Sequence, residues 1–241
     1  IPVDQTIVET SGNLIVPSST SLQVNKTIPG VEVTVNGTMT VNSNGVVFST
    51  GFTNHGKVVV TGTLINNGNI NTDTLIMSGN GSPSVLSGTG AITKLQVNGT
   101  NGVQINGNIR ITQNLNLLNG IVTINPANFI LLPAAFGPVI DGGSAVSYID
   151  GKVRWQTFST SEPLHFPLGD GGIYRPISLL VEQTSFDDFV EYEAEMIKAA
   201  PPTRTLPGTL TNVNSQWYHR VSITNGASFF DNGRIRINYV A

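Results

Sequence analysis

The sequence predicts an all-β protein in which an N-terminal parallel β-solenoid, a β-helix, is followed by an antiparallel β-sandwich. Three observations lead to this prediction. One short motif, which we call the repeated phrase, recurs along the first part of the chain. Asn-Gly pairs are frequent in the same part, and apolar residues alternate with polar ones throughout the chain. A period of two is typical of strands, whereas a helix repeats near 3.6 residues. We assign residues 1–140 to the solenoid and residues 145–241 to the sandwich.

The repeated phrase is a glycine, an aliphatic residue, polar residues, two alternating apolar residues and a second glycine. It begins at Gly68, Gly90 and Gly107, so the starts lie 22 and 17 residues apart. Its apolar pairs are Leu75 with Met77, Leu95 with Val97, and Leu115 with Leu117. This spacing favours the coils of a solenoid, each burying its apolar row against the next. A meander of hairpins uses the same Asn-Gly turns and stays open as the alternative.

The elements follow one another from an opening coil to a junction. Leu14–Pro17 and Leu22–Val24 predict the opening coil, and short alternating runs continue between the Asn-Gly turns. The segment Asn128–Gly143 holds Pro and Gly clusters beside an apolar run, which predicts a junction that caps the open end of the coil. Only eight charged residues fall in 1–140, and 19 follow, so two different kinds of core are expected.

Alternation in the second part predicts antiparallel strands with one solvated face each. In Asp187–Ala200 the residues Glu191, Glu193 and Glu195 alternate with apolar ones, which indicates an acidic face in solvent. Trp217, His219, Val221 and Ile223 share one face of a later strand, with His219 expected to be partly buried and hydrogen-bonded. Near the C-terminus Ile235, Ile237 and Tyr239 alternate with arginines.

Composition excludes several functions. The net charge is −3 and 11% of the 241 residues are charged, which is too weak a field for nucleic acid or an anionic membrane surface. Cysteine is absent, so thiol catalysis, disulfides and cysteine-ligated metals are excluded. No apolar run approaches the ~20 residues that span a bilayer. We therefore expect no membrane insertion and no cofactor.

A set of short motifs marks the second part, and its residues have physical roles. Asp150-Gly151 predicts a hairpin turn, Pro167 and Gly169 end a strand, and Pro176 holds the preceding residue extended. Arginines are expected to pair with Asp150 or Asp170, and the large aromatics to form the core. The motif residues are Tyr148, Asp150, Gly151, Arg154, Phe166, Pro167, Gly169, Tyr174, Arg175, Pro176 and Trp217.

This pattern, running from Ser147–Arg154 through Phe166–Asp170 to Tyr174–Ile177, resembles modules of repetitive cell-surface adhesins of Bacteroidota. Those adhesins serve gliding motility and biofilm formation and are exported by type IX secretion. The resemblance covers 145–241 in motif and 1–140 in style only. It implies a structural module that is secreted and held at the bacterial cell surface. It also implies a possible O-glycosylation site at Asp73-Thr74-Leu75, a short pattern that this bacterial group modifies.

The sequence offers few residues for catalysis or metal binding. Asp73 with Lys94 or Arg110 is an inadequate set for the elimination or hydrolysis that β-helix polysaccharide enzymes perform. The three histidines, at 55, 165 and 219, lack the spacing of a metal site. Calcium candidates are Asp170, in a glycine-rich loop, and the pair Asp187 and Asp188, although strand carboxylates do not converge by themselves.

We therefore expect a non-enzymatic structural or adhesive segment, a rod with a docking or surface-contact module. Its expected partners are glycans, solid surfaces or neighbouring modules of the same protein. One alternative is a carbohydrate-binding module that stacks sugars on exposed Trp155, Tyr174 or Trp217. The other is a β-helix enzyme that degrades polysaccharides.

Overall fold

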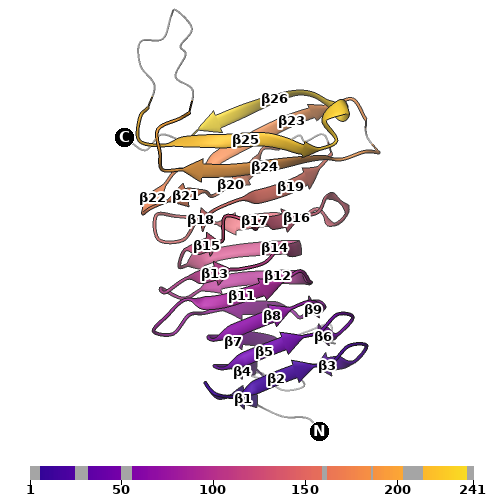
Figure 1. Ribbon diagram of the computed structural model, residues 1–241. Coiled ribbons are helices and arrows are strands. Elements are labelled where there is room, and N and C mark those ends of the chain that lie inside the picture. The colour runs from indigo at the N-terminus through magenta and orange to yellow at the C-terminus, as the bar shows by residue number, and fades with distance from the viewer. Residues whose placement is uncertain are drawn as a thin grey trace, which may run out of the picture.

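The computed structural model describes residues 6–24, 32–49, 56–158, 162–185, 187–202 and 214–237. His55 and Tyr239 lie outside these ranges. Short strands stack in coils from the N-terminal end, and antiparallel strands lie over the last coil (Figure 1). The solenoid makes about six turns, so the all-β class and the parallel solenoid are confirmed and the hairpin meander is wrong.

Each coil contributes a strand to three columns, which we call the first, second and third faces. The first face holds β1 (Thr6–Val8), β4 (Glu32–Val35), β7 (Lys57–Val60), β10 (Thr74–Met77), the later halves of β12 (Ala91–Asn98) and β14 (Ile109–Asn119), and β17 (Val139–Gly142). The second holds β2 (Asn13–Val16), β5 (Thr38–Val41), β8 (Thr63–Asn66), β11 (Ser84–Gly88), β13 (Val103–Ile105), β15 (Val122–Ile124) and β18 (Ile149–Asp150).

The third face holds β3 (Ser21–Gln23), β6 (Val46–Phe48), β9 (Asn69–Asn71), the earlier halves of β12 and β14, β16 (Ile130–Leu132) and β19 (Val153–Thr157). All pairs within these columns are parallel. Inward residues form apolar ladders that run along the stack. On the second face Met39, Leu64 and Leu86 are successive neighbours, and all three are fully buried. The core is therefore a column of aliphatic rows.

The repeated phrase predicts part of the register between neighbouring coils correctly. Leu75 pairs with Leu95 and Leu95 with Leu115, so the predicted apolar ladder is confirmed. The start at Gly107 is wrong, because Ile92 pairs with Ile111 rather than Ile109. Glycines recur at the corners because the coils approach closely there. A Cβ added to Gly90 would lie 2.3 Å from the carbonyl oxygen of Gly68 in the coil below.

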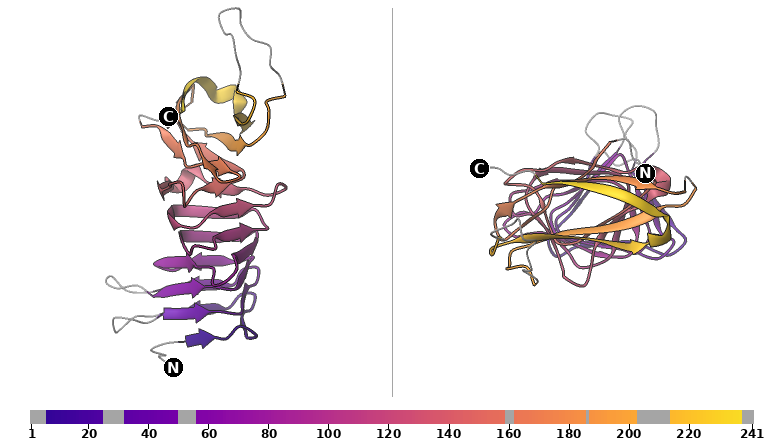
Figure 2. Two further views of the ribbon diagram at one scale, coloured as in Figure 1. Left: turned by 90° about the vertical axis from the view of Figure 1, so that its left-hand side faces the viewer. Right: turned by 90° about the horizontal axis from the view of Figure 1, so that it is seen from above.

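Antiparallel strands follow the solenoid and share its sheet. β19 pairs with β24 (Val190–Ile197), which pairs with β25 (Tyr218–Asn225). A second group is β20 (Leu164–Phe166), β23 (Ile177–Gln183) and β26 (Phe230–Ile237), and a third is β21 (Gly169–Asp170) with β22 (Ile173–Tyr174). Seen along the stack, β25 and β26 lie on opposite sides of an oval outline (Figure 2). The short 3-10 helices are η1 (Ala134–Phe136) and η2 (Ala227–Phe229).

Strand pairing crosses the expected border between the two parts without a break. β17, β18 and β19 add parallel strands to all three faces between residues 139 and 157. The cap predicted at Asn128–Gly143 is wrong, because that segment contributes β16 and β17 to the coils. The hairpin predicted at Asp150-Gly151 is also wrong: β18 and β19 each pair with the coil below, so Gly151, with φ +137°, turns a solenoid corner.

The sequence also predicts an apolar face for the last strand and no membrane insertion. Ile235 and Ile237 do not face a solvent-free core, because they are 52% and 39% exposed on β26. Within the described residues β26 pairs with β23 alone, so one of its two edges has no neighbouring strand there. Within the described ranges, neither three-residue helix has the length and apolar character needed to cross a membrane.

Candidate functional site

The motif residues of the second part gather where the last coil meets the antiparallel strands. Tyr148 is fully buried, its hydroxyl accepts a hydrogen bond from the Gly172 N–H at 3.1 Å, and its ring lies 6.1 Å from that of Tyr174. A Cβ on Gly169 would lie 2.5 Å from the Tyr148 ring, so only glycine fits there. These residues join the solenoid to its covering sheets, which is a structural role.

The aromatic side chains proposed as a sugar platform lie mostly in the core. Trp155 is 6% exposed and packs edge-on against buried Phe166 at 5.4 Å, and Trp217 is 9% exposed. Both are covered, so the prediction of an exposed platform is wrong for them, whereas their predicted place in the core is confirmed. Tyr174 is half-buried. β20 ends at Phe166, directly before Pro167, as the sequence indicates.

Arg175 and His219 form a second, half-buried contact in this region. The Arg175 guanidinium lies 5.7 Å from the Trp217 ring, and its Nη1 donates to the Tyr174 carbonyl at 2.9 Å. The Arg175 carbonyl accepts a hydrogen bond from His219 Nε2 at 2.8 Å, while His219 Nδ1 is buried without a partner in the described part. Burial lowers the pKa of His219, and the hydrogen bond opposes that shift. The expected partly buried, hydrogen-bonded histidine is confirmed.

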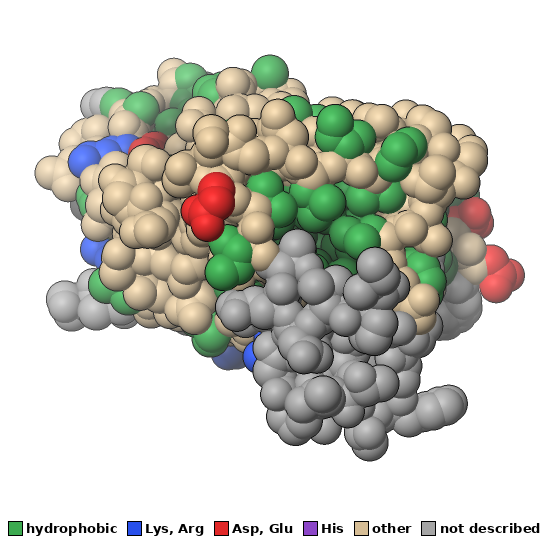
Figure 3. Space-filling model, turned by 90° about the horizontal axis from the view of Figure 1, so that it is seen from below, with side chains coloured by type: hydrophobic (Ala, Val, Ile, Leu, Met, Phe, Trp, Pro, Cys, Tyr) green, Lys and Arg blue, Asp and Glu red, His purple; other side chains and the backbone are tan. Residues whose placement is uncertain are grey.

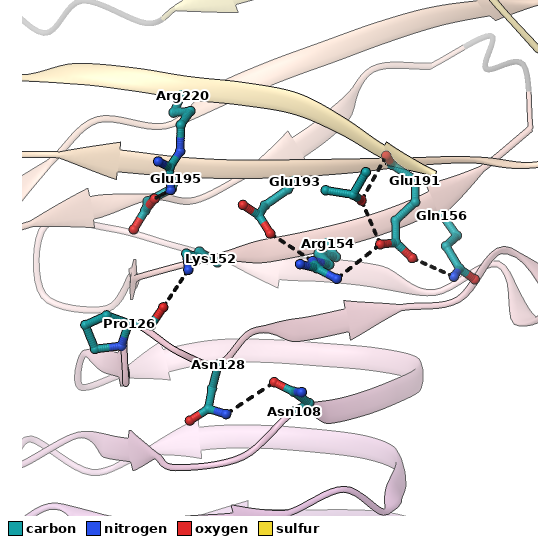
Figure 4. A network of polar contacts seen from close by, with 11 residues as sticks. Asn108, Pro126, Asn128, Lys152, Arg154, Gln156, Glu191, Glu193, Glu195 and Arg220 are labelled. Carbon is teal, nitrogen blue, oxygen red and sulfur yellow. Dashed lines mark hydrogen bonds and ion pairs between the residues drawn. The ribbon is translucent and has the colours of Figure 1, made fainter. Parts of the chain in front are cut away.

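A polar network lies on the outer side of β19, β24 and β25 (Figure 4). Arg154 Nε contacts Glu193 Oε2 at 2.8 Å, and its Nη1 lies 3.5 Å from Glu191 Oε1. Gln156 Nε2 and Thr224 Oγ1 also donate to the Glu191 carboxylate, at 2.8 and 2.7 Å. The Arg154 guanidinium covers the Phe129 ring at 3.8 Å. The network links the last coil to the covering strands.

Two expectations about these charges are wrong. Glu191 and Glu193 are each 8% exposed, so they do not form a solvated face. They are covered because β24 lies between β19 and β25, which bring cations and donors against it. Arg154 pairs with these glutamates rather than with Asp150 or Asp170, because it is the register partner of Glu193. Glu195, nearer the end of the strand, pairs with Arg220 at 2.6 Å.

The calcium candidates have protein partners. Asp170 Oδ2 accepts the Lys198 backbone N–H at 2.7 Å, and Lys198 Nζ donates to the Gly171 carbonyl at 2.9 Å. Asp188 accepts a hydrogen bond from Ser185 Oγ, and Asp187 lies in the same exposed loop. Among the residues that the structure describes, no three acidic or histidine side chains converge as metal ligands would. Burial, followed by the nearby Asp170 carboxylate, raises the pKa of Asp150.

Three charged residues of the solenoid, Asp73, Lys94 and Arg110, lie on or beside its third face. Lys94 Nζ is 3.7 Å from Asp73 Oδ1, and both side chains are partly exposed. Arg110 lines a shallow groove of about 410 Å³ on the third face. The other outward polar residues that line this groove are Asn69, Asn71, Thr93 and Thr112. Thr93 Oγ1 donates a hydrogen bond to Asn71 Oδ1 at 3.0 Å. This groove was not predicted from the sequence, although outward polar residues spaced by one coil are its signal.

Thr74, the predicted glycosylation acceptor, begins β10 on the first face. It is half-buried, and its register partner in the coil below is Lys57. It alternates with buried Leu75 and therefore faces outward. Modification at this position stays a prediction.

Comparison with known proteins adds no assignment to this geometry. No family model, no curated protein and no solved structure matches the chain.

Proposed function

We propose that this chain is a non-enzymatic structural and adhesive segment of a secreted bacterial surface protein, a stiff rod with a surface-contact module. The observation that supports the proposal is the unbroken ladder of strand pairs from β1 to β25, with one apolar core beneath it. Each fully buried aliphatic side chain contributes about 1.5–3 kcal/mol, so stacking stabilises a long thin body. The likeness to Bacteroidota adhesins belongs to the same proposal.

The antiparallel strands that follow the solenoid would form the surface-contact module at the end of the rod. We propose that β24 and β25 pack against β23 and β26 as a sandwich. The edge-on contact between Tyr192 and Phe230, with centroids 6.3 Å apart, supports this packing. The Arg154 network then fixes the module to the last coil, so that a force on one is transmitted to the other.

Weak contact with glycans or solids would use the outward polar rows of the solenoid. Asn, Thr and Ser side chains repeat from coil to coil, and strands lie ~4.8 Å apart, so one kind of contact recurs along the shaft. Many weak contacts of this sort give strong attachment in sum. The groove beside Arg110 is a polar feature of this kind on the third face, and it supports a second candidate function, carbohydrate binding.

Adsorption on a quartz crystal microbalance tests the adhesive function. We expect the protein to bind several polysaccharide films and bare solids weakly, and tandem copies to bind far more strongly. The triple variant Asn69→Ala, Asn71→Ala, Thr93→Val should lose part of this adsorption. Its control is Gln96→Ala with Asn116→Ala, which removes outward polar groups from the first face instead.

Three results decide between the candidates. Broad adsorption that both variants reduce slightly supports a general contact surface. Tight binding to one polysaccharide, lost only in the groove variant, supports the carbohydrate-binding function. Release of reducing ends or unsaturated products from uronate polymers would refute the non-enzymatic proposal.

A further inference from the structure

Two arginines stand side by side on the outer face of the β20–β23–β26 sheet. Arg234 and Arg236 alternate along β26, so their α-carbons lie ~6–7 Å apart on one face. Their register partners on β23 are Leu180 and Ser178. Both arginines are exposed. On the opposite face of this sheet Ile177 and Leu179 of β23 are buried, whereas their partners Ile237 and Ile235 on β26 are exposed.

In the part of the chain that the structure describes, these two arginines differ from Arg154 and Arg220 by having no protein partner. Among the described residues, Arg154 and Arg220 pair with glutamates, whereas neither Arg234 nor Arg236 has an ion pair or a hydrogen bond from its side chain. The carboxylate of Glu182, two residues from Leu180 on β23, accepts a hydrogen bond from Asn232. Two positive charges thus lie close together, and their guanidinium N–H groups have no acceptor among the described residues.

The surface between the arginines and the neighbouring strands is hollow and largely apolar. A groove of about 320 Å³ is lined by Pro163, Ser178, Leu180 and residues 234–236. The Ser178 hydroxyl lies 3.5 Å from His165 Nδ1 and adds a polar group at the same level. Aliphatic walls beside cations match an acidic pyranose, whose C–H face is apolar and whose substituents carry hydroxyl and acidic groups.

We propose that this groove, which we call the arginine groove, binds an acidic polysaccharide. Arg234 and Arg236 hold carboxylate or sulfate groups through paired N–H donors, and Leu180 and Pro163 contact the ring. The site goes beyond the adhesive rod, because it needs neither the solenoid faces nor tandem copies. Two cations on a chain of net charge −3 are too few for nucleic acid, which demands many phosphate contacts, or for an anionic bilayer, which demands a larger basic cluster.

Binding to immobilised polysaccharides tests the arginine groove with the whole chain. Polygalacturonate is compared with its methyl ester, and dextran sulfate with neutral dextran, so that each pair differs only in charge. We expect at least one charged polymer to bind and both neutral ones to fail. The double variant Arg234→Gln, Arg236→Gln should weaken binding about tenfold or more. Leu180→Ser, which keeps the charge, should also weaken it.

The matched control is Lys57→Gln with Lys94→Gln, which removes the same charge from the solenoid outside the groove beside Arg110 and should change affinity less than about twofold. Equal losses in both double variants would show general charge attraction and overturn the proposal. Tighter binding to RNA or to phosphatidylserine vesicles at the same ionic strength would overturn it as well. Circular dichroism verifies that each variant is folded. A null result here, with adsorption on solids intact, rejects the arginine groove and leaves the adhesive rod standing.

Discussion

At the scale of single residues, Arg154 determines how the covering sheets attach to the solenoid. Its side chain is 28% exposed, while those of Glu191 and Glu193 are 11% exposed. Carboxylates withdrawn from water to this degree need a cation and several donors, since their desolvation is costly. Arg154 serves two of them at once and also lies on Phe129. The sequence places these groups 37 and 39 residues apart, and only the strand register brings them together.

We predict that Arg154→Met destabilises the protein by about 2–4 kcal/mol, because it leaves two nearly buried carboxylates without their cation. The matched control is Arg220→Met, which breaks the pair with Glu195 on a side chain that is 49% exposed. Exposed pairs contribute little, so this change should cost less than about 1 kcal/mol. Urea unfolding of both variants measures the difference, and equal losses would contradict a special role for Arg154.

His219 makes a separate prediction about pH. Burial lowers the pKa of His219 below its ordinary value of 6.5, so the folded protein resists a proton that the unfolded chain accepts. The stability that depends on the neutral ring is fully present above pH 6.5 and is lost as the pH falls through the folded pKa. Nδ1 has no described partner, so a proton there would be buried without an acceptor.

We therefore expect the free energy of unfolding to be lower at pH 5.5 than at pH 7.5, and His219→Gln to reduce that difference. Gln can still donate to the Arg175 carbonyl, which keeps the native hydrogen bond. Burial also lowers the pKa of His165, so His165→Gln is the informative companion variant. The raised pKa of Asp150 acts with the opposite sign, and comparing slopes between variants separates it. An unchanged slope in His219→Gln would refute the assignment.

At the scale of strands, local alternation predicts which residues face inward, but not how many residues fill a corner. Leu75, Leu95 and Leu115 fall in register as the repeated phrase indicates, since buried rows must align to exclude water. The phrase fails at Gly107 because this glycine stacks on Gly88 rather than on Gly90: a Cβ added to it would lie 2.1 Å from the Gly88 carbonyl oxygen. The pairing of β12 with β14 also shifts by one residue between Ile92 and Lys94. A bulge of this kind leaves no mark in composition, so a motif aligned on its glycine slips.

The errors about β24 and the aromatics have a related cause. Alternation shows that Glu191 and Glu193 share a face, but it does not show that β19 and β25 cover that face. Trp155 likewise alternates with polar residues, and this alternation is the same whether its face of the strand is buried or exposed. Burial at these positions depends on pairing between segments roughly 25–40 residues apart. The groove beside Arg110 was missed for the same reason, because its residues come from four coils.

The register predicts that one coil can be removed whole. Deleting residues 75–94 joins Thr74 to Leu95 and removes one strand from each face, so that Val58 takes Leu95 as its neighbour. β13 then follows β8, and β14 follows β9, with inward residues still aligned. We expect a folded protein whose length falls by about one strand spacing, ~4.8 Å, in small-angle X-ray scattering.

A deletion of residues 75–84 is the control, since it removes half a coil and sets apolar residues against polar ones. We expect this variant to unfold or aggregate, as judged by circular dichroism and size-exclusion chromatography. If both deletions fold equally well, the stacked coil is not the unit of this structure.

At the scale of the whole molecule, the two ends of the stack differ. The last coil is covered by β24 and β25, whereas at the lower end hydrophobic side chains are visible inside a polar rim (Figure 3). Val8, Leu14 and Leu22 of the first coil are only partly buried, while inward residues of the middle coils are fully buried. In a linear stack each coil is stabilised by its neighbours, so a coil with one described neighbour opens first.

Matched substitutions in one ladder test this gradient. Leu14 and Leu64 lie in the same column of the second face, two coils apart, and Leu64 is fully buried. Leu64→Ala should cost about 2–5 kcal/mol, because it leaves a cavity between two coils. Leu14→Ala should cost about 1 kcal/mol, because less apolar surface leaves the water there. Hydrogen exchange should show the same order, with fast exchange in β1 to β3 and the slowest in β11 to β14. Uniform protection along the stack, or equal costs at Leu14 and Leu64, would mean that the solenoid unfolds as one cooperative block rather than coil by coil from its open end.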